Sequence, residues 1–571
     1  MSREYPLISD INFQKKINKK YNKYTLPKKK QTFKQICYPK EFKLQVPQKM
    51  LGDYISPKTP YKGILIFHRI GAGKTCTAVN IGEQWKHKRR IKVVLPASLK
   101  GNFKNELRSQ CASDNYLTEK ERHELKKHHP SSKEYKEIIK KSDERINKHY
   151  DVYSYNKFVE LIEIRKMDLT NCVLIIDEVQ NMVSETGVYY ETLYNIIHKA
   201  PSNLRIVLLS ATPMFDKPQE IALTMNLLRL PIQLPTGKEF EKLFINYDSK
   251  GRASAKNLDI FKERIKGFVS FYRGAPPYVF PESNIKFIKC EMSDYQYKSY
   301  LAVKTKELKK IDRKGFTKGN VRKLPNNFFI GTRIISNISF PGRQINESGY
   351  KEFKGKYLRE PYLSYYSTKF SKILSKIKSA KGPVFIYSNF KEFGGIKSLV
   401  KVLKANGYLD YIKHGEGRKR FAVWSGDQTN EVREEIKAVY NQPSNVNGSK
   451  LRIILGTPSM KEGVSLMNVR QIHILEMYWN WSRILQVIGR GIRYCSHKQL
   501  DEEDRNVNVY IYMSTHEKEK QSIDQYITEL ALNKNKLIQE FEMALKEAAI
   551  DCSILKNGNN FKGEDPIKCQ I

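Results

Sequence analysis

Short apolar runs alternate with longer amphipathic stretches in two separate parts of the chain. In the first part the runs are ILIF (64–67), KVVLP (92–96), VLIID (173–177) and IVLLSA (206–211). In the second part they are VFIYS (384–388), FAVWSG (421–426), RIILG (452–456), QIHILE (471–476) and VYIYM (509–513). Runs of this length, each followed by a helical pattern, predict strands buried on both faces of a parallel sheet. The chain is therefore predicted to hold two α/β blocks of the doubly wound type.

Three further segments have a different texture. Residues 235–375 are polar, rich in lysine and less periodic, so we expect an accessory region between the two blocks, with a rigid turn at GAPPYVFPE (274–282). Residues 112–150 have the pattern of a polar, helical insertion in the first block. Residues 519–571 form a tail with helical apolar periodicity, and we expect it to pack on the second block.

Charge is the strongest constraint that the composition adds. The 571 residues include 101 Lys and Arg against 60 Asp and Glu, which gives a net charge of +41. A field of this sign attracts polyanions, so nucleic acid is the first candidate partner. Codon bias in an AT-rich genome explains part of the lysine excess equally well, and this alternative stays open. Residues 1–40 carry eleven Lys/Arg against two Asp/Glu, and we expect a basic arm that is partly disordered until it meets a polyanion, or a flexible tail without that role.

The cysteines and the apolar runs exclude several classes of protein. None of the eight cysteines forms a CxxC pair or a Cys/His cluster with zinc spacing, so we expect reduced thiols in an intracellular compartment. The first residues contain no apolar signal region, and no apolar run reaches the roughly 18 residues of a membrane helix. We therefore expect a soluble protein that is not exported.

The first predicted strand ends in HRIGAGKT (68–75), whose core is the pattern of a phosphate-binding loop. The backbone N–H groups of Gly71, Ala72, Gly73, Lys74 and Thr75 are expected to point at phosphate oxygens. Lys74 would neutralise the charge of the β- and γ-phosphates, and the Thr75 hydroxyl would hold Mg²⁺. The usual first glycine of this signature is His68 here, so the strict pattern fails at one end.

Two carboxylates follow the third predicted strand, in VLIIDEVQN (173–181). Ligands bind at this end of the strands in such sheets. Asp177 is expected to reach Mg²⁺, and Glu178 to orient and deprotonate the attacking water. The alternative, an acidic pair that caps a helix, is weaker because the phosphate loop lies upstream.

Two hydroxyl residues follow the fourth predicted strand, in LLSATPMFDKP (208–218). Ser210, Ala211 and Thr212 are expected to sense the γ-phosphate and to couple its presence to another surface. As isolated residues they would be ordinary turn formers.

Arginines recur in NWSRILQVIGRGIRYCSH (480–497). Arranged as one helix, Gln486, Arg490 and Arg493 share a face, and the isoleucines at 484, 488 and 492 share another that would pack on the second sheet. Gly489 and Gly491 would each cost about 1 kcal/mol inside a helix, which indicates a close backbone approach there. Arg490 and Arg493 are expected to meet the γ-phosphate when the two blocks close, so that hydrolysis depends on closure.

The ordered set GxGKT, DExx, SAT and QxxGRxxR resembles that of superfamily 2 helicases and translocases over residues of about 40–500. The resemblance implies two RecA-like domains in tandem. It also implies that Gln48 recognises adenine, that Gly463 and Gln486 contact ATP, and that nucleic acid is gripped by the following residues: Ser98, Lys100, Asn389 and Thr457. Gln180, at the fourth position of the DExx box, departs from the DEAD and DEAH groups.

A narrower resemblance rests on YWNWSRILQVIGRGIRYCSH (478–497), TRIISNISFP (332–341), SIDQYI (522–527) and LKEAAIDC (545–552). These segments resemble the helicase-type transcription ATPases of large cytoplasmic DNA viruses, a family that includes poxvirus nucleoside triphosphatase I and the small subunit of the poxvirus early transcription factor. Relatives also occur on cytoplasmic linear plasmids of yeasts.

Together these resemblances imply an ATP hydrolase that uses ATP and Mg²⁺ and depends on nucleic acid, with DNA favoured over RNA. The implied partners are nucleic acid and a viral-type RNA polymerase or transcription factor subunit, without a membrane. The implied location is the cytoplasm, and packaging in a virion is compatible with it. The predicted domains are a basic arm (1–40), a RecA-like ATP-binding domain (41–234), an accessory region (235–375), a second RecA-like domain (376–518) and a helical tail (519–571).

Two other functions remain open at this point. One is an RNA helicase that unwinds duplexes. The other is a promoter-binding or polymerase-bridging subunit for which ATP is only a switch, and the intact set of Lys74, Asp177, Glu178, Arg490 and Arg493 argues against it.

Overall fold

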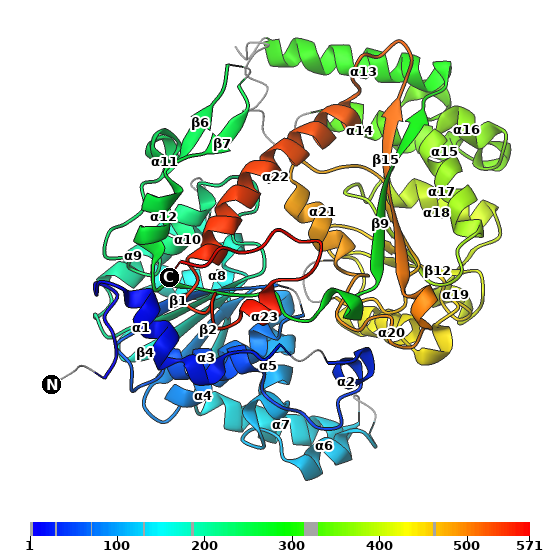
Figure 1. The fold of residues 1–571 in the computed structure, drawn as a ribbon. Coiled ribbons are helices and arrows are strands. Elements are labelled where there is room, and N and C mark those ends of the chain that lie inside the picture. The colour runs from blue at the N-terminus through cyan, green and yellow to red at the C-terminus, as the bar shows by residue number, and fades with distance from the viewer. Residues whose placement is uncertain are drawn as a thin grey trace. The chain divides into compact units, whose positions relative to one another are not determined.

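The computed structural model describes residues 4–570, apart from 29–30, 70, 129–131, 184–187, 250, 313–328 and 461–463. The chain divides into two compact units (Figure 1). The first unit comprises Met1–Pro277 together with Lys536–Ile571, and the second comprises Tyr278–Asn535. Each unit is built around one parallel sheet, as the apolar runs predict.

The first unit has a six-stranded parallel sheet in the order β3-β2-β4-β5-β1-β8. Its strands are β1 (Gly63–His68), β2 (Arg90–Leu95), β3 (Tyr150–Ser154), β4 (Cys172–Asp177), β5 (Arg205–Ser210) and β8 (Val269–Tyr272). All four apolar runs of the first block are confirmed as strands. The central strands β1, β4 and β5 are buried at every residue, because helices cover both faces of the sheet.

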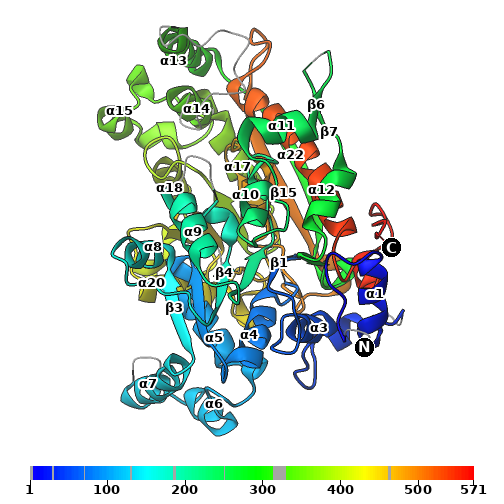
Figure 2. The ribbon, with the colours of Figure 1, turned by 90° about the vertical axis from the view of Figure 1, so that its left-hand side faces the viewer.

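Alternate residues of these strands contribute to two separate hydrophobic cores. One core combines Ile64, Ile66, Val173 and Ile175 with helices α3 (Val46–Tyr54), α4 (Lys74–Trp85) and α5 (Lys100–Leu107). The opposite core combines Leu65, Leu174, Ile176 and Leu208 with α8 (Tyr155–Glu163), α9 (Val188–Lys199), α10 (Glu220–Asn226), α11 (Gly237–Phe244) and α12 (Leu258–Ile265). In Figure 2, α8 and α9 lie on one side of the strands, and α3, α4 and α5 on the other.

The remaining helices of the first unit are α1 (Phe13–Lys20), α2 (Phe33–Cys37), α6 (Glu119–Leu125), α7 (Lys133–Asn147) and α23 (Lys556–Asn559). Helices α6 and α7 form the predicted polar insertion. The expectation of a disordered basic arm is wrong for residues 4–28, because Phe13, Ile17 and Tyr21 are buried in the core that holds α3 and α4. Apolar residues at helical spacing anchor this lysine-rich segment.

The second unit has a seven-stranded parallel sheet in the order β11-β12-β13-β10-β14-β15-β9. Its strands are β9 (Glu282–Glu291), β10 (Val384–Tyr387), β11 (Leu409–Asp410), β12 (Arg420–Trp424), β13 (Ile453–Gly456), β14 (Gln471–Ile474) and β15 (Asn506–Thr515). All five apolar runs of the second block are confirmed as strands. The fold class predicted from the sequence, two doubly wound α/β domains, is thus confirmed.

Helices flank the second sheet as well. They are α13 (Asp294–Asp312), α14 (Ile330–Asn337), α15 (Glu347–Glu352), α16 (Tyr362–Tyr366), α17 (Thr368–Lys378), α18 (Ile396–Ala405), α19 (Tyr411–His414), α20 (Asn430–Tyr440) and α21 (Trp481–Ile488). The segment predicted to be an accessory region therefore contributes ordered helices, and it also supplies β8 to the first sheet and β9 to the second. A short antiparallel pair, β6 (Ile245–Tyr247) and β7 (Ala253–Ala255), precedes β8.

The predicted tail helix exists as α22 (Ile523–Glu547), but the prediction of where it packs is only half right. Ile523 and Ile527 join the core of the second unit. Leu537, Phe541 and Leu545 join the core of the first unit. The apolar period identifies the buried face of a helix, and it does not identify which core that face covers.

The cysteines contradict the expectation of reduced thiols. Cys76 is bonded to Cys111, and Cys552 to Cys569, in disulfides, whereas Cys172 and Cys290 are free and buried. Composition could not reveal these pairs because their spacing, 35 and 17 residues, matches no short motif. Among the described residues, none of the helices has the length and apolar character that a membrane crossing needs.

Candidate active site

The phosphate loop, residues 71–75, joins the end of β1 to the start of α4, as predicted. Gly71 and Gly73 have φ angles of 87° and 70°, a left-handed conformation that glycine adopts without strain. A Cβ atom on Gly73 would lie only 2.5 Å from Gln48 Nε2, so a larger residue there would displace the Gln48 amide. Helix α4 begins at Lys74, and its first N–H groups face the loop, which is the usual arrangement for binding phosphate.

Lys74 contacts both carboxylates at the end of β4. Its Nζ lies 2.6 Å from Glu178 Oε1 and 3.6 Å from Asp177 Oδ1. Glu178 has a φ of 51°, a conformation that turns the chain sharply after the strand. Burial raises the pKa of Asp177 to about 6, and the Lys74 ammonium opposes this rise. Lys74 and Glu178, which are 104 positions apart, are thus brought together with Asp177 as one charged cluster, as the sequence predicts.

A chain of hydrogen bonds leads from Glu178 to the SAT motif. Gln180 Nε2 donates to Glu178 Oε2 at 2.6 Å, and Ser210 Oγ donates to Gln180 Oε1 at 2.7 Å. The Thr212 N–H then donates to Ser210 Oγ at 3.0 Å. Ser210 is fully buried and Gln180 is 6% exposed. Gln180, which departs from the DEAD and DEAH patterns, is therefore the residue that joins Glu178 to the SAT motif.

Tyr155 supports the strand end that carries the two carboxylates, a role that was not predicted from the sequence. Its hydroxyl donates to the carbonyl oxygens of Asp177, at 2.6 Å, and Glu178, at 2.9 Å. It is the first residue of α8, directly after β3. The hydroxyl fixes the backbone of the strand end that carries both carboxylates.

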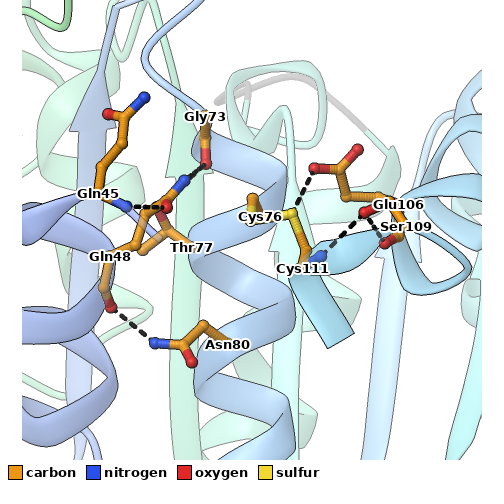
Figure 3. Close-up of a disulfide and its surroundings, with 9 residues drawn as sticks. All are labelled: Gln45, Gln48, Gly73, Cys76, Thr77, Asn80, Glu106, Ser109 and Cys111. Atoms are coloured by element: carbon orange, nitrogen blue, oxygen red, sulfur yellow. Dashed lines mark hydrogen bonds between the residues drawn. A yellow bond between two sulfur atoms is a disulfide. The ribbon is translucent and has the colours of Figure 1, made fainter. Parts of the chain in front are cut away.

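Gln48 lies on α3, and its amide contacts the phosphate loop (Figure 3). Its Nε2 donates to the Gly73 carbonyl at 3.2 Å, and its Oε1 accepts from the Gln45 N–H at 2.7 Å. Asn80 on α4 donates to the Gln48 carbonyl at 2.8 Å. These bonds place Gln48 beside the loop, where the sequence predicts a residue that recognises adenine.

The Cys76–Cys111 disulfide begins one residue after Thr75 (Figure 3). It ties the first turn of α4 to the segment that follows α5. Glu106 Oε1 lies 3.0 Å from Cys111 Sγ, and both cysteines are buried in the core under α4. The start of the phosphate-binding helix is therefore fixed covalently.

The residues predicted to contact nucleic acid have unequal exposure. Ser98 is exposed, and Lys100 and Asn389 are half-buried. Thr457 is buried, with its hydroxyl 2.8 Å from Ser459 Oγ and 3.2 Å from the Trp424 carbonyl oxygen. Thr457 therefore shapes the end of β13 in this structure.

The QxxGRxxR segment differs from its predicted form. Helix α21 ends at Ile488, so Arg490 and Arg493 lie in the turns beyond it and do not continue a helical face with Gln486. The prediction of a single helix through residue 493 is wrong, because Gly489 and Gly491 end it. The predicted close approach is confirmed at Gly491, where a Cβ atom would lie 3.1 Å from the side chains of Ile472 and Val469.

Within the second unit, Gln486 and Arg493 are half-buried, Arg490 is buried, and Arg493 donates a hydrogen bond to the Val464 carbonyl. The isoleucines at 484 and 488 join the core, as predicted, and Ile492 packs against it. Gly463 lies outside the described residues.

The cluster of Lys74, Asp177 and Glu178 beside the phosphate loop suits phosphoryl chemistry. Hydroxyl and carboxylate oxygens, here of Thr75 and Asp177, are the ligands that Mg²⁺ prefers. Asp177 ends β4, and Thr75 lies in the first turn of α4, after β1 of the same sheet. When bound, the ion neutralises phosphate charge. The arrangement defines a nucleotide-hydrolysing enzyme of the two-domain helicase type.

Comparison with known families agrees with this class. Residues 16–346 match the model of the SNF2-related domain, and residues 368–495 match that of the helicase conserved C-terminal domain. The chain therefore belongs to the SNF2-related ATPases of helicase superfamily 2, as the motifs predict, and it is an ATP hydrolase of the helicase and translocase type.

Similar proteins come from large DNA viruses. The chain is 53% identical over 569 residues to a protein named putative ATP-dependent RNA helicase R563 of Acanthamoeba polyphaga mimivirus, and the match covers 99% of both chains. It is 26% identical over 559 residues to a protein named termination factor NPH-I homolog of African swine fever virus, with 86% of this chain and 76% of the relative covered. The Hef helicase domain of Pyrococcus furiosus, a solved structure, shares 12% identity over 84% of this chain and 96% of that one, with a TM-score of 0.43.

Proposed function

We propose that the protein is a nucleic-acid-dependent ATPase and translocase, stimulated mainly by DNA, that acts in viral-type transcription. The observation that carries this proposal is the Lys74–Asp177–Glu178 cluster beside the phosphate loop, joined through Gln180 to the SAT motif. The net charge of +41 supports a polyanionic partner.

The proposed roles follow from chemistry and position. Lys74 binds the β- and γ-phosphates, Thr75 and Asp177 are the residues that would hold Mg²⁺, and Glu178 accepts a proton from the attacking water. Glu178 now bonds to Lys74, so nucleotide binding would replace that contact and release the carboxylate for this role. Gln48 lies where it would meet the adenine ring.

Arg490 and Arg493 are proposed to stabilise the charge on the transferred phosphoryl group, while Gly463 and Gln486 contact the nucleotide. Arginine residues with this role raise turnover by roughly 10³–10⁵. Arg490→Ala and Arg493→Ala should keep nucleotide affinity and lose stimulated turnover, which the rate of phosphate release and nucleotide titration measure separately. Variants that hydrolyse ATP like the parent would contradict this role.

Transcription is proposed as the setting because relatives named as termination factor homologues share 26% identity over most of the chain. An RNA polymerase or transcription factor subunit of viral type is the corresponding partner. The cytoplasm, or a virion, is the corresponding location. This location stays a prediction, and the disulfides Cys76–Cys111 and Cys552–Cys569 remove reduced thiols as an argument for it.

The second candidate function is an ATP-dependent RNA helicase, which the name of the 53% identical mimivirus relative favours. ATP hydrolysis by the purified protein should be compared in the presence of double-stranded DNA, single-stranded DNA and RNA of equal length, at low and high salt. Strongest stimulation by DNA, with affinity falling steeply as salt rises, supports the proposal. Stimulation by RNA alone, together with strand separation, supports the RNA helicase.

The third candidate function is a non-enzymatic bridging subunit, and a measurement of ATP hydrolysis tests it. A protein that binds ATP but shows no single-turnover hydrolysis with any nucleic acid would act as a switch only.

A further inference from the structure

His68 replaces the usual first glycine of the phosphate-loop signature, and the structure gives this side chain a specific partner. It ends β1 and is fully buried, with Nε2 2.9 Å from Ser270 Oγ on the neighbouring strand β8. Strands β1 and β8 pair in parallel, with Ile66 opposite Ser270 and His68 opposite Tyr272. A polar side chain that is fully buried at a strand end needs such a partner, because an unpaired one costs free energy.

Ser270 in turn contacts the distant C-terminal segment. Its Oγ donates to Asp551 Oδ2 at 2.5 Å, and the Phe271 N–H donates to Asp551 Oδ1 at 3.0 Å. The Ile550 N–H donates to the Val269 carbonyl at 2.9 Å, so the segment also pairs with the backbone of β8. Asp551 belongs to LKEAAIDC (545–552), a segment that the ATP site itself does not use.

Strand β8 and the residues directly after it also approach the phosphate loop and the residue that leads into it. The Arg69 N–H donates to the Tyr272 carbonyl at 3.1 Å. Gly274 has a φ of 91°, and a Cβ atom there would lie 2.9 Å from Ala72 Cβ. The chain that leads into the loop is thus bonded to β8, Ala72 lies against the segment that follows β8, and β8 itself is bonded to Asp551.

We propose that His68, Ser270 and Asp551 are positioning residues for ATP hydrolysis: they form a buried hydrogen-bonded relay through which the C-terminal segment fixes the phosphate loop. The inference rests on the proposed role of residues 71–75 in binding phosphate. Because the loop binds through backbone N–H groups, its affinity depends on how narrowly its conformation is held before the nucleotide arrives.

The charge state of the relay fits this role. Burial, with a smaller contribution from the Lys74 charge, lowers the pKa of His68 to about 3. The imidazole is therefore neutral at physiological pH and adds no second cation behind Lys74. Because the Ser270 hydroxyl donates its hydrogen to Asp551, the neutral imidazole donates from Nε2 to Ser270 Oγ.

The test is a comparison of KM, kcat and thermal unfolding for Ser270→Ala and His68→Gly in the full chain. Losing a buried hydrogen-bond partner should raise the KM for ATP about tenfold in each variant, with kcat affected less than KM. The double variant should raise the KM no further than either single one, since both changes break the same relay.

Gln14→Ala is the matched control. Gln14 is buried and its Nε2 donates to the Ile550 carbonyl at 2.9 Å, one residue before Asp551, without a contact to Ser270 or His68 among its hydrogen bonds in the described structure. It should lower the unfolding temperature and leave the KM for ATP unchanged. Equal losses of stability in Gln14→Ala and Ser270→Ala, with the KM unchanged in both, would overturn the proposal.

Asp551→Asn keeps the shape of the carboxylate and can still accept from the Phe271 N–H, so it guards against variants that fail to fold. It should stay within about threefold of the parental KM, whereas Asp551→Ala should behave like Ser270→Ala. Asp551→Asn and Asp551→Ala with the same KM as the parent would also overturn the proposal. Lys74→Ala distinguishes a failure of the proposed function from a failure of the relay. Full turnover in that variant refutes the phosphate-binding role of the loop. Lost turnover in Lys74→Ala, with an unchanged KM for ATP in the relay variants, refutes the relay alone.

Discussion

Both sheets end in a cluster of a lysine with carboxylates, and the two clusters differ in exposure. In the first unit the side chains of Lys74 and Glu178 are 12% and 15% exposed, at 2.6 Å from one another. In the second unit those of Lys369 and Asp524 are 0% and 2% exposed, at 2.7 Å. Lys369 also donates to Asn337 Oδ1 and to the Leu475 carbonyl, both at 3.0 Å.

The difference separates a site from a structural contact. Lys369 has three donor hydrogens and three acceptors, all enclosed by α14, α17 and α22, so it has no reason to exchange partners. Lys74 sits on a loop with left-handed glycines at a strand end, where a phosphate can replace a carboxylate. An ion pair is therefore a candidate site only when its surroundings allow a ligand to replace one of the two partners.

The largest expected effect is on catalysis by Lys74→Ala. Without the ammonium, phosphate charge in the transition state is less stabilised, and turnover should fall at least roughly a hundredfold. The fold should survive, since Lys74 lies beyond a strand end and outside the hydrophobic cores of the unit. Phosphate release measures the turnover of the variant, and thermal unfolding measures its stability. A variant that loses stability without a specific loss of turnover would show that Lys74, like Lys369, is a structural residue.

Lys369→Met should show the opposite profile. It leaves Asp524 buried without its cation, which should cost about 3–5 kcal/mol in the free energy of unfolding of the second unit. Denaturant unfolding measures this loss. The double variant Lys369→Met, Asp524→Leu should recover part of it, because no charge then stays buried alone. A loss smaller than that of an exposed lysine would show that the pair is not structural.

Asp551 extends the comparison to pH, since it accepts its hydrogen bonds from neutral groups, whereas Asp524 faces a lysine. Burial raises the pKa of Asp551 to about 7, above its ordinary value near 4. Between these values the folded state binds the proton more tightly, so stability falls as the pH rises from about 4 to about 7. Relative to Asp551→Asn, the parent should lose on the order of 1–4 kcal/mol across that window. A pH-independent difference in denaturant unfolding would contradict the assignment.

The smallest expected effect belongs to Ser210→Ala. Ser210 donates to Gln180, and removing this bond should weaken the link from Glu178 to the SAT motif by about 1 kcal/mol. The ratio of nucleic-acid-stimulated to basal ATP hydrolysis should fall about fivefold. Ser142→Ala, which removes a buried serine bonded to Arg108, is the control and should leave that ratio unchanged.

The sequence predicted the central strands of both sheets and failed at their edges. Every strand of the two parallel sheets that it missed, namely β3, β8, β9 and β11, lies at an edge or pairs with one neighbour only. Strand β9 shows the cause: most of its residues are exposed, so it lacks the apolar run that burial on both faces imposes. An edge strand is held mainly by pairing with its neighbour, so its amino-acid composition gives only a weak signal.

The site divides in the same way. Lys74, Asp177, Glu178 and Ser210 were predictable because short motifs carry them beside strong strands. The bridging role of Gln180 and the relay of His68, Ser270 and Asp551 were not, because their partners are fixed only by the fold; Ser270 and Asp551 are 281 positions apart. The helix end at Ile488 was missed because an apolar period continues past the glycines that stop it.

The most direct test of the account is single-turnover hydrolysis of ATP by Glu178→Gln beside the parent, with saturating DNA. Glutamine keeps the size of the side chain and cannot accept the proton of the attacking water. The variant should bind ATP with near-parental affinity and release phosphate roughly 10²–10⁴ times more slowly. Phosphate release at the parental rate would show that the carboxyl end of the first sheet does not carry the chemistry assigned to it.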